Sequence, residues 1–110
     1  MNRAKRKRLE AAGWKFETVE EFLNLTPEEV ELIELRLTLS RALKEERRRR
    51  NLSQKEVAKL LKVTQPRVSR MESGDPSISL DTMLRSLFGL GATNKTLGKT
   101  IAAAKSIYAA

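Results

Sequence analysis

The stretch from Leu52 to Gly74 decides the fold, and it reads LSQKEVAKLLKVTQPRVSRMESG. Its opening Ser53, with a glutamate three residues later, has the pattern of a capping box and predicts a helix over 54–61. After a short turn, Thr64 predicts the start of a second helix over 65–73, and the final glycine of the stretch ends it. The segment is therefore expected to form two short helices joined by a tight turn.

Apolar residues in this stretch place the two helices against each other. The first helix offers Val57, Ala58, Leu60 and Leu61 as buried residues, and the second offers Val68 and Met71. The small Ala58 allows close approach, and Val63 fills the turn. This spacing suits two helices that meet at a steep angle and share one small core.

The second helix presents a polar outer face. With Val68 inward and 100° per residue, the outward residues are Pro66, Ser69, Arg70 and Ser73, with Gln65 and Arg67 on the flanks. Glutamine suits adenine, arginine suits guanine and a proline ring can contact a thymine methyl, so the face could read a major groove. An ordinary solvated helix face is the alternative. The presence of a single acid on this helix, Glu72, favours a surface that meets phosphate.

The remaining chain is also predicted to be helical, with no strands and no internal repeat. A short helix is expected over 19–24 and a long one over 27–50, where Pro27 follows the capping Thr26. Further helices are expected over 80–88 and, more weakly, over 94–106. The fold class is therefore all-α.

Composition excludes several classes of function. The 110 residues correspond to about one domain, and the absence of Cys and His removes disulfides, thiolate nucleophiles, zinc fingers and histidine chemistry. No catalytic constellation remains, so we expect neither an enzyme nor a cofactor or metal. No signal peptide or membrane span is recognisable, which makes a cytoplasmic location the default expectation. The net charge of +8 favours a polyanionic partner, with nucleic acid first and an anionic membrane surface second.

Charge is distributed in blocks that suggest a domain organisation. The net charge is +4 over residues 1–10, −6 over 11–35 and +5 over 36–50. We interpret 1–10 as a basic disordered arm, 11–35 as an acidic extension, 36–92 as the DNA-binding domain and 93–110 as a C-terminal helix and tail. The unbroken run from Arg47 to Arg50 has two interpretations that can hold together: cations that stabilise a helix end, or contacts to phosphate.

Residues 41–91 resemble the helix-turn-helix domain of the lambda-repressor-like, Xre-type family, through LSQ, EVA, VTQPRVSRMESG and SLDTMLRSL. The resemblance implies a five-helix domain whose helix 65–73 enters the major groove. The resemblance implies that Gln65, Pro66 and Arg70 contact bases. We add Ser69, which lies on the same outward face of the helix. The resemblance also implies that Gln54 contacts phosphate and that Thr64 and Arg67 contact phosphate or flanking bases. We add Ser53 and Arg48 as further candidate phosphate contacts. The resemblance further implies an ion pair between Arg47 and Glu72, whereas Lys62 stands where the family usually has glycine in the turn.

The segment before this domain is similar to HigA-like antitoxins. The similarity lies in GWKFETVEEFLNLTPEEVELIELRLTLSRALK, followed by the helix-turn-helix. It implies binding to a small basic ribonuclease toxin of the RelE type and repression of the chain's own operon. Trp14, Phe16 and Phe22 are then candidate partner-binding residues; alternatively, they cover the long helix, within one chain or across a dimer.

These observations favour a sequence-specific DNA-binding repressor that acts as a homodimer on an inverted repeat, and that is also the antitoxin of a toxin–antitoxin pair. A protein-interaction module, or an antitoxin with little DNA binding of its own, is the alternative.

Overall fold

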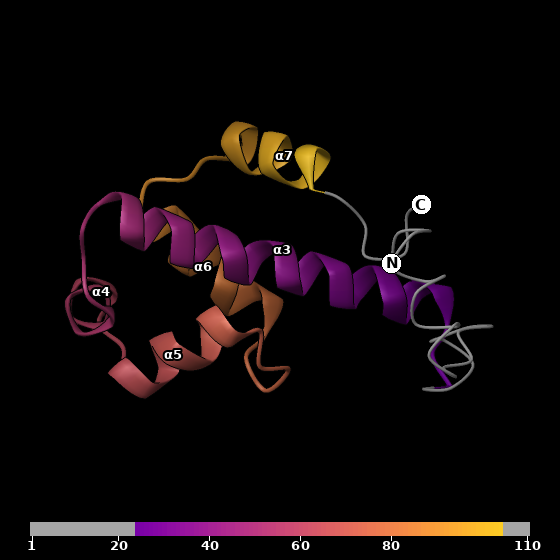
Figure 1. Cartoon of the computed structure of the whole chain (residues 1–110), viewed down its shortest axis with the longest axis horizontal. Helices are drawn as coiled ribbons and strands as arrows, with labels where there is room; N and C mark the ends of the chain where they lie inside the picture. The colour runs from indigo at the N-terminus through magenta and orange to yellow at the C-terminus, as the bar shows by residue number, and fades with distance from the viewer. Residues whose placement is uncertain (1–23, 105–110) are drawn as a thin grey trace, which may run out of the picture. The chain divides into compact units, whose positions relative to one another are not determined.

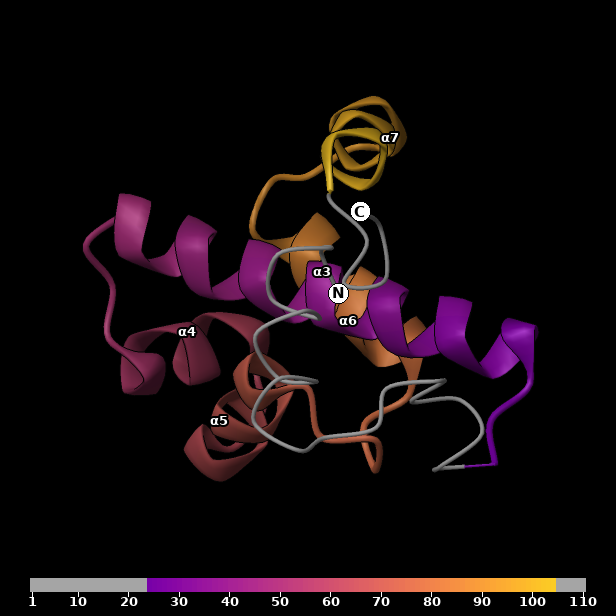
Figure 2. The ribbon, with the colours of Figure 1, turned by 45° about the vertical axis from the view of Figure 1, so that its right-hand side comes forward.

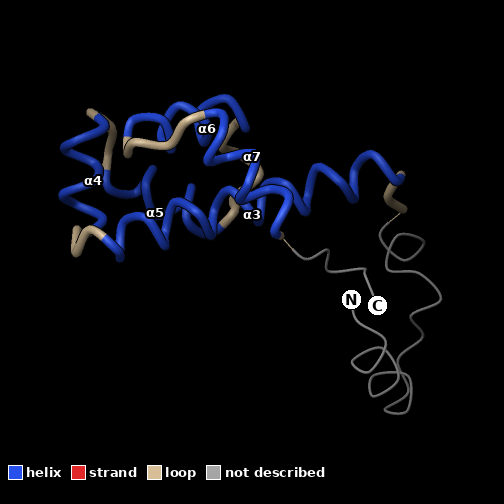
Figure 3. The backbone as a smooth tube through the Cα atoms, turned by 90° about the horizontal axis from the view of Figure 1, so that it is seen from above, coloured by secondary structure: helices blue, strands red, loops and turns tan. Residues whose placement is uncertain are grey.

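The computed structural model describes residues 24–104, which contain five helices and no strand. In chain order these are α3 (Pro27–Arg49), α4 (Gln54–Leu61), α5 (Gln65–Ser73), α6 (Leu80–Gly89) and α7 (Asn94–Ala103) (Figure 1). The fold is all-α, as the sequence predicts. Short loops join successive helices (Figure 3).

Several predictions concern residues outside the described range. These are the basic arm 1–10, the acidic residues 11–23 with Trp14, Phe16 and Phe22, and the tail 105–110. Of the helix predicted over 19–24, only Asn24 is described, and it lies in a turn with a φ of 56°.

Side-chain caps start the two central helices where the sequence predicts. The Ser53 hydroxyl oxygen accepts a hydrogen bond from the Glu56 N–H at 3.0 Å, and the Glu56 carboxylate accepts one from the Ser53 N–H at 3.0 Å. These bonds complete the capping box of α4. At α5, the Thr64 hydroxyl oxygen accepts from the Arg67 N–H at 3.3 Å. Lys62 ends α4 with a left-handed φ of 58°, so this lysine adopts the conformation that glycine adopts most readily.

One core unites the compact unit Leu35–Ala103. Every helix contributes buried apolar side chains to it: Leu39, Leu43, Val57, Ala58, Val68, Met71, Met83, Leu87 and Leu97. Within this unit, α4 and α5 lie on one side of α3 and α7 on the other (Figures 1 and 2). The core therefore fixes α5 while leaving its outer surface in solvent.

Three details differ from the expectations. Leu60 is 56% exposed, because Val57, Ala58 and Leu61 define the inward side of α4 and Leu60 projects about 110° from its centre. Leu32 is 52% exposed, although helical spacing predicts that it shares one apolar stripe of the long helix with Leu35, Leu39, Ala42 and Leu43. The last helix ends at Ala103 rather than at residue 106.

Arg36 of α3 and Arg50, the residue directly after α3, hold the loops on either side of α6. Arg36 donates hydrogen bonds to the carbonyl oxygens of Asp75, at 3.4 Å, and of Ile78. Arg50 donates to the carbonyl oxygen of Leu90, and a Cβ on Gly91 would lie 2.7 Å from the Arg50 guanidinium. These contacts position α6, and none of them was anticipated from the sequence. No helix within residues 24–104 combines the length and apolar character needed to cross a bilayer.

Candidate nucleic-acid interface

The outer face of α5 carries the predicted base-contacting residues. Val68 and Met71 are buried on the opposite side of the helix. The exposed residues of α5 include all four candidates, Gln65, Pro66, Ser69 and Arg70. We call these four residues the reading face.

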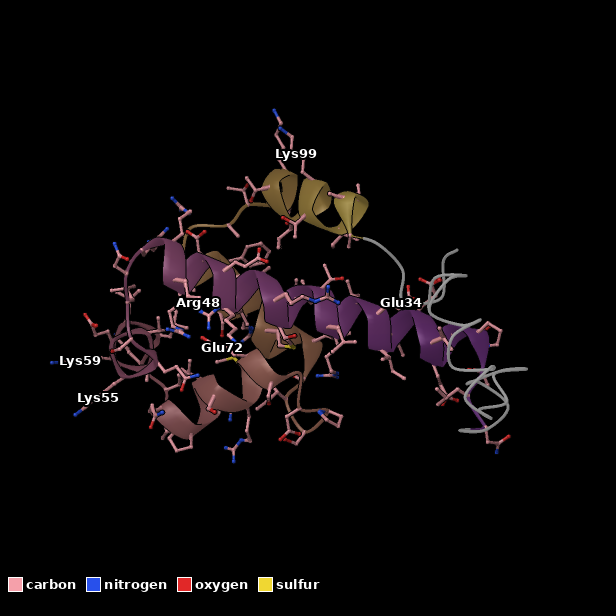
Figure 4. The ribbon with its side chains drawn as sticks, viewed as in Figure 1. Glu34, Arg48, Lys55, Lys59, Glu72 and Lys99 are labelled. Carbon is pink, nitrogen blue, oxygen red and sulfur yellow. The ribbon has the colours of Figure 1, made fainter. Side chains whose placement is uncertain are left out.

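The one carboxylate of α5 is turned away from this face. The Glu72 side chain is only 5% exposed, and its Oε2 lies 2.6 Å from Nε of Arg47 on α3. A second bond, from Arg47 Nη2 to Glu72 Oε1 at 3.0 Å, makes the pair bidentate. Glu72 raises the pKa of the Arg47 guanidinium through these bonds. Figure 4 shows Glu72 on the side of α5 that faces α3. The reading face therefore presents no negative charge to a DNA phosphate.

A chain of hydrogen bonds extends from this ion pair to the start of α5. Gln54 Nε2 donates to Glu72 Oε1 at 3.2 Å, and Gln65 Nε2 donates to Gln54 Oε1 at 3.1 Å. Arg47 also donates through Nη1 to the Leu52 carbonyl oxygen at 3.0 Å. The Gln65 amide is thus held by one of its two N–H groups, which leaves its oxygen and second N–H for a base edge. The network orients Gln65 before any ligand binds.

Four of the five predicted phosphate contacts lie on α4, on α5 or at the N-caps of these helices, and the fifth lies on α3. The hydroxyl oxygens of Ser53 and Thr64 accept the capping bonds, and each hydroxyl retains a hydrogen to donate. Gln54 and Arg67 are partly buried, whereas Arg48 is exposed near the end of α3 (Figure 4). All five are polar or charged side chains, which are the kinds of group that contact phosphate oxygens.

The arginine run at the end of α3 is largely neutralised within the protein. Arg47 pairs with Glu72, and Glu46 pairs with both Arg49, at 2.6 Å, and Arg50, at 2.8 Å. Hydrogen bonds from Arg49, which has the largest effect, and from Arg50 lower the pKa of the Glu46 carboxyl. Among the residues that the structure describes, only Arg48 of this run has no carboxylate partner.

A hollow of about 510 Å³ opens between the α4–α5 turn and α6. Its cationic lining residues are Lys62, Arg67, Arg70 and Arg85. Lys62 and Arg85 are not among the predicted DNA contacts, because they lie 23 residues apart in the sequence and only the fold brings them to one hollow. The positive charge that both residues carry is the only sequence feature that could have suggested them as site residues.

Two short helices on a shared core, with a polar and acid-free outer face on the second, define a helix-turn-helix DNA-binding protein. The chain belongs to a helix-turn-helix domain family, whose sequence model matches residues 22–95. No curated protein and no solved structure matches the chain.

Proposed function

We propose that the chain is a sequence-specific transcriptional repressor of the Xre type whose DNA-binding domain spans residues 36–92. In this proposal α5 enters the major groove, where Gln65, Pro66, Ser69 and Arg70 contact bases. The phosphate contacts come from Ser53, Gln54, Thr64, Arg67 and Arg48. The observation that carries the proposal is the removal of the only acid of α5 into a bidentate pair with Arg47.

The geometry of the Arg47–Glu72 pair supports sequence-specific recognition of DNA rather than non-specific attraction to it. A surface that merely attracts DNA needs cations, whereas a surface that reads it needs donors and acceptors held in fixed positions. Gln65 is held by Gln54, and Gln54 is held by Glu72. Because Glu72 is itself fixed by Arg47, the hydrogen-bonding atoms of Gln65 are oriented by the core of the domain.

We further propose that the repressor acts as a homodimer on an inverted repeat. Single helices of this size contact only a few base pairs, and two copies placed one turn of DNA apart, about 34 Å, double the site and its specificity.

Selection of duplexes from a random pool by the full chain tests the proposal. We expect enrichment of an inverted repeat whose half-sites are centred about 10 base pairs apart. The double variant Gln65→Ala with Arg70→Ala should bind DNA without that preference, whereas Lys99→Ala on α7 should select the same repeat. If the wild-type chain enriches no sequence and protects no DNA even at low salt, the repressor proposal is wrong.

An antitoxin role is a second candidate, supported by the first turns of α3. Glu28, Glu29 and Glu31 are exposed there, next to the exposed apolar Leu32. Acidic side chains around an apolar residue suit a basic protein partner, and the resemblance to HigA-like antitoxins suggests a RelE-type toxin. Co-purification with the product of an adjacent reading frame, lost when these glutamates become glutamine, tests this role.

A further inference from the structure

We propose that the hollow between α5 and α6 holds a phosphate of the DNA backbone on the α6 side of the major groove, with Lys62, Arg67 and Arg85 as its cationic contacts. The inference rests on the proposed docking of α5. It adds α6 to the DNA interface and adds Lys62 and Arg85 to the DNA contacts.

The position of the hollow follows from the two flanks of α5. On one flank, Gln65 and Glu72 bond to Gln54 and Arg47, so this flank faces α4 and α3. The opposite flank carries Arg67 and lines the hollow, together with residues of α6. The two flanks therefore meet different surroundings: a closed hydrogen-bond network on one side and an open space on the other.

Arg70 connects the hollow to the reading face. It is one of the four exposed residues of that face, and it also lines the hollow. A helix in the major groove, which is about 12 Å wide, has a phosphate backbone along each side. With the start of α4 beside one backbone, the hollow lies toward the other.

The charge of the hollow suits a phosphate. Lys62 and Arg67 form no ion pair within residues 24–104. Arg85 pairs with Asp81 at 3.1 Å, but the two side chains are 80% and 72% exposed. Such exposed pairs are weak, so a phosphate can displace Asp81 from Arg85. The cations come from the turn, α5 and α6, which gives a phosphate donors from three directions.

The experiment compares wild-type chain with Arg85→Gln and Lys62→Gln on the duplex that the wild type selects. Each variant should bind about tenfold more weakly at low salt. The slope of log affinity against log salt should fall by about 0.9 for each lost phosphate contact, while base preference stays unchanged. Lys99→Gln, which removes one charge from the outer side of α7 (Figure 4), is the matched control and should keep the wild-type slope.

A scan with single methylphosphonates, which lack the phosphate charge, locates the contact. Wild-type chain should lose affinity at phosphates on both sides of the groove. Arg85→Gln should lose its response at one of these phosphates only, which a purely structural effect of the substitution would not produce.

Either of two results would overturn the inference while leaving the repressor proposal intact. The first is that Arg85→Gln and Lys62→Gln both keep the salt slope and the methylphosphonate profile of the wild type. The second is binding of inorganic pyrophosphate that Arg85→Gln abolishes, combined with an unchanged DNA profile; the hollow would then hold a free phosphate ligand. Failure of the wild type to select any duplex would instead remove the repressor proposal and this inference together.

Discussion

The arginines at the end of α3 form one unbroken run, whereas the cations around α5 are scattered in the sequence, and the two groups have different surroundings. Three of the four residues from Arg47 to Arg50 pair with Glu46 or Glu72. Around α5, Arg67 forms no ion pair within the described part of the chain, and Arg85 has only an exposed one. The unbroken run from Arg47 to Arg50 therefore contributes less available charge than the scattered residues near α5.

The difference shows that available charge depends on the acids that the fold brings near each cation. Glu46 lies within one turn of Arg49 and Arg50, so those pairs are local. Glu72 reaches Arg47 across 25 residues of sequence, and this pair joins α3 to α5. Cations near Glu46 and Glu72 stabilise the domain, whereas those around the hollow remain available to a polyanion.

The largest effect should come from separating the partly buried pair. Arg47→Met leaves the carboxylate of Glu72 inside the domain without its partner, and we expect a loss of about 3 kcal/mol in the free energy of unfolding. Urea denaturation measures this loss. The double variant Arg47→Met with Glu72→Met should recover most of it, since no charge is then left unpaired. A loss below 1 kcal/mol in the single variant would contradict a structural role for the pair.

Substitutions on the reading face should instead reduce discrimination between bases and leave the free energy of unfolding almost unchanged. Gln65→Ala and Arg70→Ala are each expected to lose about 1–3 kcal/mol of discrimination against the wrong base, because each removes one set of base-edge hydrogen bonds. The free energy of unfolding should change by less than about 0.5 kcal/mol, since both side chains are exposed. Competition binding with single-base variants of the selected duplex measures the first quantity. Loss of stability without loss of discrimination would remove these residues from the site.

Local patterns in the sequence predict the helices well and the contacts between them poorly. Ser53, Thr64 and Gly74 act through neighbours within a few residues, so the starts of α4 and α5 and the end of α5 follow from them. The bonds from Arg36 to the α5–α6 loop span about 40 residues, and no spacing rule reveals them. Leu60 was misplaced for a related reason: apolar character alone does not say which side of an eight-residue helix faces the core.

Some of the candidate site residues likewise follow from local sequence patterns, whereas others depend on contacts between helices. A helical wheel drawn around Val68 predicts the reading face, because burial of one side of a helix exposes the other. The bond between Gln54 and Gln65, and the hollow shared by Lys62 and Arg85, require the relative placement of separate helices. The family resemblance supplied the Arg47–Glu72 pair, which composition and periodicity alone do not indicate.

Two different substitutions of Lys62 should distinguish its effect on stability from its effect on DNA binding. It adopts a left-handed φ of 58°, which costs an L-residue about 1–2 kcal/mol, partly offset by the greater freedom of glycine in the unfolded chain. Lys62→Gly should therefore raise the free energy of unfolding by about 0.5–1 kcal/mol while weakening DNA binding. Lys62→Gln, which removes the charge but keeps a side chain, should weaken binding without the gain in stability. Thermal denaturation and binding to the selected duplex, measured on both variants, separate the two effects.

The smallest effect should come from the paired end of α3 and should appear only in acid. Arg49 and Arg50 hold the pKa of the Glu46 carboxyl below its ordinary value of 4.5. A carboxyl whose pKa is lowered by folding contributes stability above its unfolded pKa, and this contribution is lost as the pH falls through the folded pKa. Glu46→Gln should therefore lower stability by less than 1 kcal/mol at pH 7 and flatten its decline between pH 5 and about pH 3. Glu56, whose pKa is lowered by hydrogen bonds from Ser53, remains in that variant, so part of the acid dependence should persist. An acid dependence identical to that of the wild type would mean that Glu46 does not stabilise the helix end, and that the charges of Arg49 and Arg50 are more available to DNA than the pairing implies.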